Sequence, residues 1–114
     1  MKRLSVIIVT IAAVISISTA QDKEVIESTF KVFGNCDQCK ARIEKAIKIK
    51  EVKYAKWDKK TKMLRTAFEN SITVDSLQKR LAYAGHDTEK YKANDSTYAA
   101  LPECCLYRDN KKTH

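Results

Sequence analysis

Two cysteines separated by two residues, Cys36 and Cys39, give this sequence its clearest chemical signal. Apolar residues recur at helical spacing from Cys39 onwards, so the pair lies where a helix begins. A helix N-terminus carries partial positive charge and unpaired N–H groups, which favour thiolate over thiol. Two thiolates at this spacing suit a soft ion that accepts few ligands, and Cu(I) or Hg(II) is such an ion.

Two other interpretations of the pair compete with metal binding. A plain disulfide is one, because an exported chain meets oxidising conditions. A redox-active pair of the thioredoxin type is the other, but Asn35 precedes Cys36 where that type often has tryptophan. The position of the pair at the first strand-to-helix junction favours metal binding.

Adjacent cysteines, Cys104 and Cys105, lie near the end of the chain. Their Cα atoms are about 3.8 Å apart across a trans peptide, which is shorter than the roughly 4.4–6.8 Å of most disulfides. The twelve residues from Lys92 to Cys104 can span about 40 Å, so these sulfurs can reach Cys36 and Cys39. Four sulfurs could hold Zn(II) in a tetrahedron or Cu(I) in a small cluster. Alternatively, the tail is mobile and its cysteines form unrelated disulfides.

The segments around these residues predict one small α+β domain. Residues 25–33, 52–57, 63–68 and 87–92 have the composition of strands, and 58–61 forms a hairpin turn. Two amphipathic helices follow Cys39 and Thr73, and the second ends at Gly85. The order βαββαβ predicts a ferredoxin-like fold with a four-stranded antiparallel sheet and two helices on one face.

His86 is a further candidate ligand. It follows Gly85 in the loop before the last predicted strand. In this fold the loop lies beside the cysteine pair, because the last strand is antiparallel to the first. The imidazole can supply a third, exchangeable ligand or shield the site from solvent. The alternative is an exposed loop histidine without a role.

The ends of the chain indicate export. Residues 1–20 have a basic start, an apolar run and small residues before Gln21, as expected of a cleaved signal peptide. The alternative is an uncleaved N-terminal anchor, for which the apolar run is short. We expect a domain over 21–92 and a cysteine-containing tail over 93–114, located in the periplasm or secreted. The formal net charge is +8, and loss of Lys2 and Arg3 leaves +6. A basic monomer of this kind suits an acidic partner or an anionic membrane, and export argues against nucleic acid.

Residues 30–39, Phe-Lys-Val-Phe-Gly-Asn-Cys-Asp-Gln-Cys, resemble the Gly-Met-x-Cys-x-x-Cys signature of the heavy-metal-associated (HMA) domain family. The resemblance covers about residues 25–92, including Ile43, Ile47 and Val52. That family includes copper chaperones, domains of copper-exporting ATPases and periplasmic mercury-binding proteins. This chain departs from the signature at Asn35, where relatives have a methionine that packs under the metal loop. A polar residue there could loosen the loop or add a hydrogen bond to it.

The resemblance implies that Cys36 and Cys39 are metal ligands. It also implies a metallochaperone or scavenger without enzymatic activity, whose cargo is Cu(I), with Hg(II) or Zn(II) as alternatives. Its partner would be a membrane metal transporter or another metal-binding domain. Two rivals remain open. One is a thiol–disulfide oxidoreductase in which Cys36 and Cys39 exchange with Cys104 and Cys105, and the other is a domain stapled by disulfides.

Overall fold

The computed structural model describes residues 24–108, so the predicted signal peptide at 1–20 lies outside the described residues. No helix in the described part of the chain is long and apolar enough to cross a membrane. The elements, in chain order, are β1 (Val25–Lys31), α1 (Asp37–Ala46), β2 (Val52–Trp57), β3 (Met63–Glu69), α2 (Val74–Tyr83), α3 (Asp95–Ala99) and a 3₁₀ turn, η1 (Glu103–Cys105).

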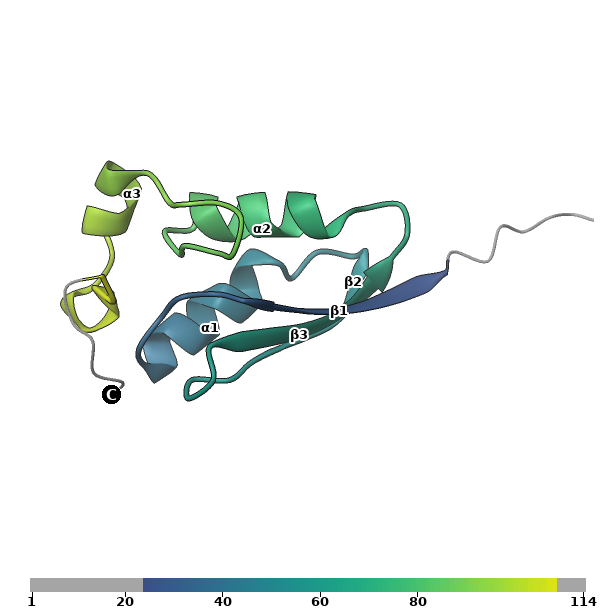
Figure 1. The fold of residues 1–114 in the computed structure, drawn as a ribbon, viewed down its shortest axis with the longest axis horizontal. Coiled ribbons are helices and arrows are strands. Elements are labelled where there is room, and N and C mark those ends of the chain that lie inside the picture. Colours follow the sequence, from purple (N-terminus) through teal and green to yellow (C-terminus); the bar gives the residue numbers. More distant parts are fainter. Residues whose placement is uncertain (1–23, 109–114) are drawn as a thin grey trace, which may run out of the picture.

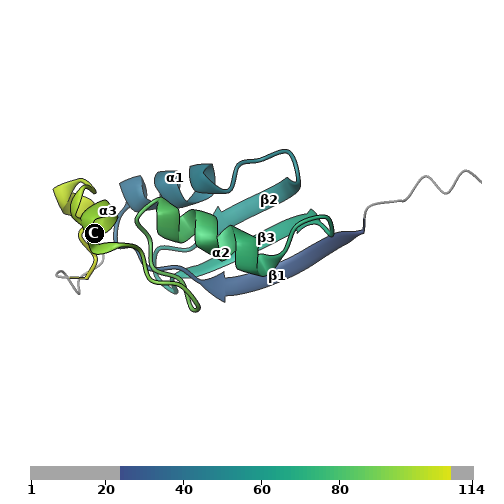
Figure 2. The ribbon, with the colours of Figure 1, turned by 90° about the horizontal axis from the view of Figure 1, so that it is seen from above.

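The three strands form one antiparallel sheet in the order β1-β3-β2. Side chains alternate along β3, so that Leu64, Thr66 and Phe68 are buried while Arg65 is exposed. Helices α1 and α2 cover the buried face, and Figures 1 and 2 show both on the same side of the sheet. The predicted α+β architecture with two helices on one face is therefore confirmed.

The second helix begins and ends as its sequence predicts. Thr73 is the N-cap, and its hydroxyl accepts a hydrogen bond from the backbone N–H of Ser76 at 3.1 Å, while the Ser76 side chain reciprocates. Gly85 follows the helix with φ of +105°. That backbone conformation strains any residue with a Cβ atom. The backbone N–H of Gly85 donates to Ala82 O at 3.0 Å, which closes the last turn.

The predicted fourth strand at 87–92 is wrong for the described chain, whose sheet has three strands. The segment makes only an isolated bridge between Thr88 and Val32. Its backbone then turns back, because Thr88 N donates to Tyr91 O at 2.7 Å and Thr88 Oγ1 accepts from Tyr91 N. The N–H of Lys31 donates to the Glu89 carboxylate at 2.8 Å instead of to a strand carbonyl. Local side-chain hydrogen bonds thus replace the ladder.

The C-terminal segment, residues 94–108, contains α3 and η1 and packs at one end of the molecule. Figures 1 and 2 place it, in yellow-green and yellow, beyond the first turn of α1. Tyr98 and Cys105 are buried, and the Leu101 side chain packs against Gly85. These contacts continue the core across the end of the domain and bring the adjacent cysteines to α1.

Replacement of Gly85 by alanine tests this junction. An added Cβ atom would lie 2.9 Å from a Leu101 methyl carbon and would carry the positive φ. We expect Gly85→Ala to lower the free energy of unfolding by about 1–3 kcal/mol. The fluorescence of Trp57, the only tryptophan, reports unfolding in urea. Tyr83→Ala is the control at an 84% exposed position and should change stability by less than about 0.5 kcal/mol. Equal stabilities would contradict the packing described.

Candidate metal centre

Trp57 of β2 holds the loop between β1 and α1 in place from the side of the sheet. Its indole N–H donates to Val32 O at 2.9 Å, and its ring lies against Gly34. A Cβ atom at Gly34 would be 3.0 Å from the Cys39 Cβ atom, so a glycine lets the loop approach the helix. Cys36 is then the N-cap of α1 in an extended conformation, with its carbonyl accepting from Lys40 N at 3.1 Å.

Asn35 replaces the apolar methionine of the HMA signature with a polar contact. The side chain is 2% exposed, and its Oδ1 accepts a hydrogen bond from the Cys39 thiol at 3.5 Å. Of the two consequences expected for this substitution, the added hydrogen bond is the one observed. Asn35 Nδ2 is buried without a hydrogen-bond partner in the described chain. The loop therefore has an uncommitted donor directly beside the cysteine pair.

Four sulfur atoms cluster around Cys36. Its Sγ atom lies 3.3 Å from Cys39 Sγ, 3.2 Å from Cys105 Sγ and 3.6 Å from Cys104 Sγ. The two tail sulfurs are 3.7 Å from each other. All four are free thiols, and Cys36, Cys39 and Cys105 are at most 6% exposed. The structure thus brings both tail cysteines to the Cys36–Cys39 pair, as their reach allowed.

The thiols differ in their readiness to ionise. Burial opposes ionisation of Cys36, but hydrogen bonds from Cys105, Cys39 and Cys104 stabilise its thiolate and lower its pKa. Burial raises the pKa of Cys39, so the helix N-terminus alone does not make both residues thiolates as expected. Burial and neighbouring thiols raise the pKa of Cys104 to about 11 and of Cys105 to about 12. Cys36 is therefore the thiol that ionises first.

Two polar side chains of α1 that the sequence did not single out also touch the sulfurs. Arg42 Nη1 donates to Cys105 Sγ at 3.2 Å, and the Cys104 thiol donates to Gln38 Oε1 at 3.2 Å. Arg42 lies three residues after Cys39, about one helical turn further along the same face of α1. The sequence carried no signal for these contacts, because they depend on where the C-terminal segment docks.

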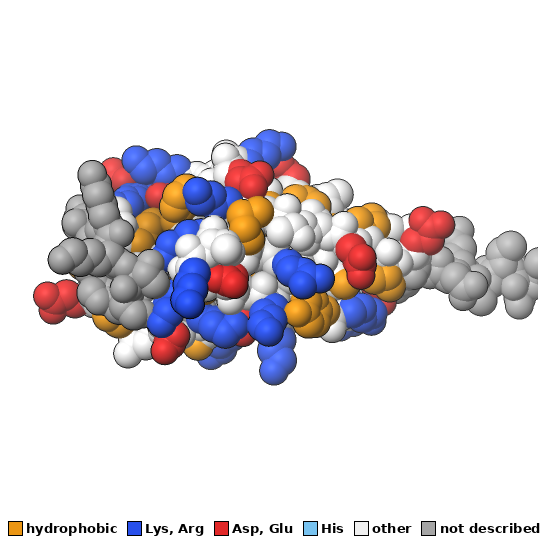
Figure 3. Space-filling model, turned by 60° about the horizontal axis from the view of Figure 1, so that its bottom comes forward, with side chains coloured by type: hydrophobic (Ala, Val, Ile, Leu, Met, Phe, Trp, Pro, Cys, Tyr) orange, Lys and Arg blue, Asp and Glu red, His pale blue; other side chains and the backbone are white. Residues whose placement is uncertain are grey.

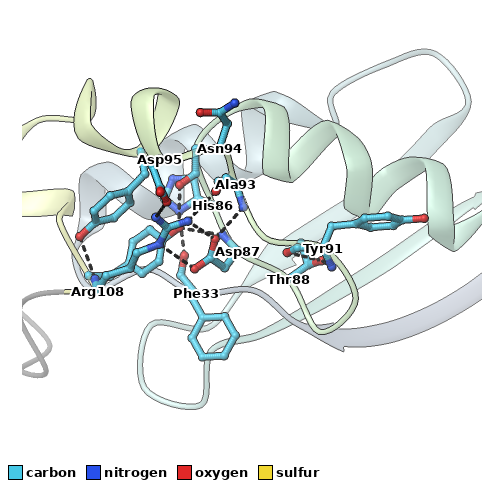
Figure 4. A network of polar contacts seen from close by, with 12 residues as sticks. Phe33, His86, Asp87, Thr88, Tyr91, Ala93, Asn94, Asp95 and Arg108 are labelled. Carbon is cyan, nitrogen blue, oxygen red and sulfur yellow. Dashed lines mark hydrogen bonds and ion pairs between the residues drawn. The ribbon is translucent and has the colours of Figure 1, made fainter.

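The docking rests on a polar network at residues 85–87, shown in Figure 4. Arg108 donates to both carboxylate oxygens of Asp87, at 2.7 and 3.0 Å, and to Ala93 O at 2.7 Å. Tyr107 Oη donates to Gly85 O at 2.6 Å and accepts from Asp87 N at 2.7 Å. A two-point Arg–carboxylate pair with little solvent access is among the stronger polar contacts in proteins. This anchor holds η1, and with it the adjacent cysteines, against α1.

His86 lies inside this anchor and not among the sulfurs. The group of ligand atoms that all lie within 4.8 Å of one another comprises Cys36, Cys104 and Cys105. The ring of His86 is fully buried and stacks on Tyr107, with centroids 5.5 Å apart. Its Nδ1–H donates to Phe33 O at 2.7 Å, so the unprotonated Nε2 is left without a hydrogen-bond partner among described residues. The observed contacts of the imidazole tie the β1–α1 loop to the C-terminal segment.

The anchor can be tested with Arg108→Gln. Loss of the ion pair should open the C-terminal segment and raise the reaction rate of Cys104 and Cys105 with a thiol reagent by about tenfold. The matched control is Arg65→Gln, at an exposed position of β3, which should leave the rate unchanged. Mass mapping of the labelled cysteines under reducing, metal-free conditions measures the effect. Equal labelling of both variants would show that Arg108 does not hold the segment.

Burial of His86 predicts a pH dependence of stability. Burial lowers its pKa from 6.5 to about 4. The unfolded chain therefore takes up a proton that the folded protein rejects as the pH falls from 6.5 to about 4. The free energy of unfolding should decrease over that interval by on the order of 3 kcal/mol. Urea titrations across the interval measure it, and His86→Gln should flatten the profile. An unchanged profile in the variant would assign the dependence to other groups.

Comparison with known proteins supports the fold. No protein-family model matches the sequence, and no curated protein matches it. Among solved structures, the chain is similar to a CopZ metallochaperone, with a TM-score of 0.52 and 21% sequence identity over 55% of this chain and 98% of that one. A solution structure of a CopA variant in a copper form, from Bacillus subtilis, matches with a TM-score of 0.49 and 23% identity over 60% and 97% of the two chains.

The CopZ match accounts for nearly all of that protein and for little more than half of this one. The predicted resemblance to HMA copper proteins is thereby confirmed at the level of the fold.

Proposed function

We propose that this protein binds a soft metal ion, Cu(I) or Hg(II), through Cys36 and Cys39 and carries it to a partner. The single observation that supports this most strongly is the sulfur cluster, in which Cys36 contacts three other free thiols within 3.6 Å. Thiolates select soft ions over hard ones. The similarity in fold to a CopZ metallochaperone supports the same assignment.

Binding would begin at Cys36, whose pKa is lowered. Its thiolate takes the ion first, and the ion then displaces the proton of Cys39, since metal ligation favours the thiolate. A Cu(I) ion with two thiolates carries a net charge of −1. The guanidinium of Arg42, at 3.2 Å from Cys105 Sγ, offsets negative charge in the cluster. An Arg42 variant without the positive charge should bind the ion more weakly. The loss of affinity should be larger the less water reaches the cluster.

Transfer would proceed by thiolate exchange. A partner thiolate adds to the bound ion, a three-coordinate intermediate forms, and one of the original thiolates leaves, so no atom is oxidised or reduced. Cys104 and Cys105 lie 3.6 and 3.2 Å from Cys36, close enough to add to the bound ion as a partner thiolate would. The tail sulfurs therefore act as internal ligands that compete with the partner. The protein holds its cargo more firmly than a two-cysteine chaperone would.

We place this function outside the cytoplasm, on the strength of the predicted signal peptide at 1–20. The partner would be a membrane metal transporter or another metal-binding domain with an acidic docking face. Figure 3 supports the charge argument, because basic side chains gather over the face it shows, with single acidic and hydrophobic side chains between them. The protein would act as a monomer and without catalysing a reaction of its own.

A thiol–disulfide oxidoreductase is the second candidate. The contact that favours it is the 3.2 Å separation of Cys36 and Cys105, which places a thiolate beside a possible exchange partner. An oxidoreductase would reduce a model disulfide catalytically when supplied with a thiol reductant. A metal carrier would instead bind one Cu(I) tightly in the reduced state and show no turnover.

The cysteine pair is tested by Cys36→Ser and Cys39→Ser. Each variant removes one of two primary ligands, and we expect each to lower Cu(I) affinity by about 100-fold or more. Anaerobic competition against a Cu(I) chelator measures the affinity. Cys104→Ser is the matched control, and its loss should be smaller because the pair stays complete. Wild-type affinity in both Cys36→Ser and Cys39→Ser would contradict the assignment.

A further inference from the structure

Three of the four sulfurs form a triangle that excludes Cys39. Cys36, Cys104 and Cys105 have Sγ atoms separated by 3.2, 3.6 and 3.7 Å, and all three lie within 4.8 Å of one another. Cys39 contacts Cys36 at 3.3 Å and interacts with Cys105, but it is not part of this group of three. The geometry points to a second coordination mode of the site. We propose that Cys36, Cys104 and Cys105 bind a trivalent metalloid, As(III) or Sb(III), through three thiolates.

The three Sγ–Sγ distances can be compared with those that each coordination geometry requires. With metal–sulfur bonds of about 2.3 Å, linear coordination needs sulfurs about 4.6 Å apart, trigonal planar coordination about 4.0 Å and tetrahedral coordination about 3.8 Å. All three observed edges are shorter than these separations. An ion bonded to this triangle lies about 1 Å above its plane, with S–ion–S angles of about 100°. That pyramid suits an ion with a lone pair on its open side, which is the geometry of As(III) and Sb(III) thiolates.

The environment of the triangle suits a neutral complex. Cys36 and Cys105 are 6% and 0% exposed, so a complex of net charge −2, as Cu(I) with three thiolates would have, would be costly to desolvate there even beside the Arg42 guanidinium. An As(III) ion with three thiolates carries no net charge. Binding of arsenous acid also needs no oxidant or reductant, because arsenic and sulfur keep their oxidation states. Three As–O bonds break, three As–S bonds form, and each thiol proton leaves with a hydroxide as water.

The approach to the triangle is through Cys104. Its side chain is partly exposed, while the other two sulfurs are buried. Gln38 Oε1 accepts a hydrogen bond from the Cys104 thiol at 3.2 Å, which holds this sulfur at the open corner. The adjacent pair Cys104–Cys105 supplies two corners from one turn, η1, so the third corner needs only Cys36. This inference rests on the proposed soft-metal function, but it uses a different set of ligands.

Single cysteine variants can distinguish the two sites, because only the Cu(I) site uses Cys39 and only the As(III) site requires Cys104. Reduced protein is titrated anaerobically with arsenite, and separately with Cu(I), in the wild type, Cys39→Ser and Cys104→Ser. We expect Cys104→Ser to lower arsenite affinity by about 100-fold or more, beyond the loss typical of an outer-shell partner. Cys39→Ser, the matched control, removes only a neighbour of the ligand Cys36, so it should cost about tenfold or less in arsenite affinity while it loses Cu(I).

X-ray absorption of the arsenite-loaded wild type provides a test that needs no variant. It should show three As–S bonds and no As–O bond. Two As–S bonds with one As–O bond, or an equal arsenite loss in Cys39→Ser and Cys104→Ser, would overturn the three-thiolate site. Cu(I) binding that depends on Cys39 would still stand in that case. Cu(I) binding unaffected by Cys39→Ser, with arsenite binding intact, would instead remove the proposed function and keep the triangle.

Discussion

The ion pair between Arg108 and Asp87 is the contact on which the site depends. It joins the end of the described chain to the loop after α2, with Tyr107 hydrogen-bonded on the same loop. Cys104 and Cys105 lie in η1, just before these residues, and so reach Cys36 only while the segment is docked. Without that anchor the domain would present a two-cysteine loop. With it, four sulfurs cluster together, three of them buried and Cys104 partly exposed.

This arrangement separates the fold from the specialisation of its site. The match to CopZ covers nearly all of that metallochaperone but 55% of this chain. Much of this chain therefore lies outside the shared fold. Residues 87–89 meet the edge of β1 only at an isolated bridge, where a fourth strand was expected, and Asp87 binds the C-terminal segment instead. Asp87 accepts hydrogen bonds from Arg108 and from the Ala93 backbone. The same residues that prevent a strand therefore anchor the cysteines.

Most strands and helices of the fold could be predicted from the sequence, because the patterns that indicate them are local. The apolar alternation of β3, the Thr73 cap and the positive φ of Gly85 depend on a few neighbouring residues. The strand at 87–92 could not be rejected in this way, since the turn between Thr88 and Tyr91 is only part of what replaces it. The other competing contacts come from Gln78 and Arg108, which lie outside the segment. Reach alone suggested that the tail sulfurs could return, but the roles of Arg42 and Gln38 required the docked geometry.

The central claim is that a soft ion is held by sulfur from this cluster. Copper K-edge X-ray absorption of the full-length, anaerobically loaded protein tests it most directly, because the measurement reports which atoms touch the ion. We expect Cu(I) to be bonded to sulfur atoms alone. A shell dominated by nitrogen or oxygen, or copper that dissociates on desalting, would contradict it.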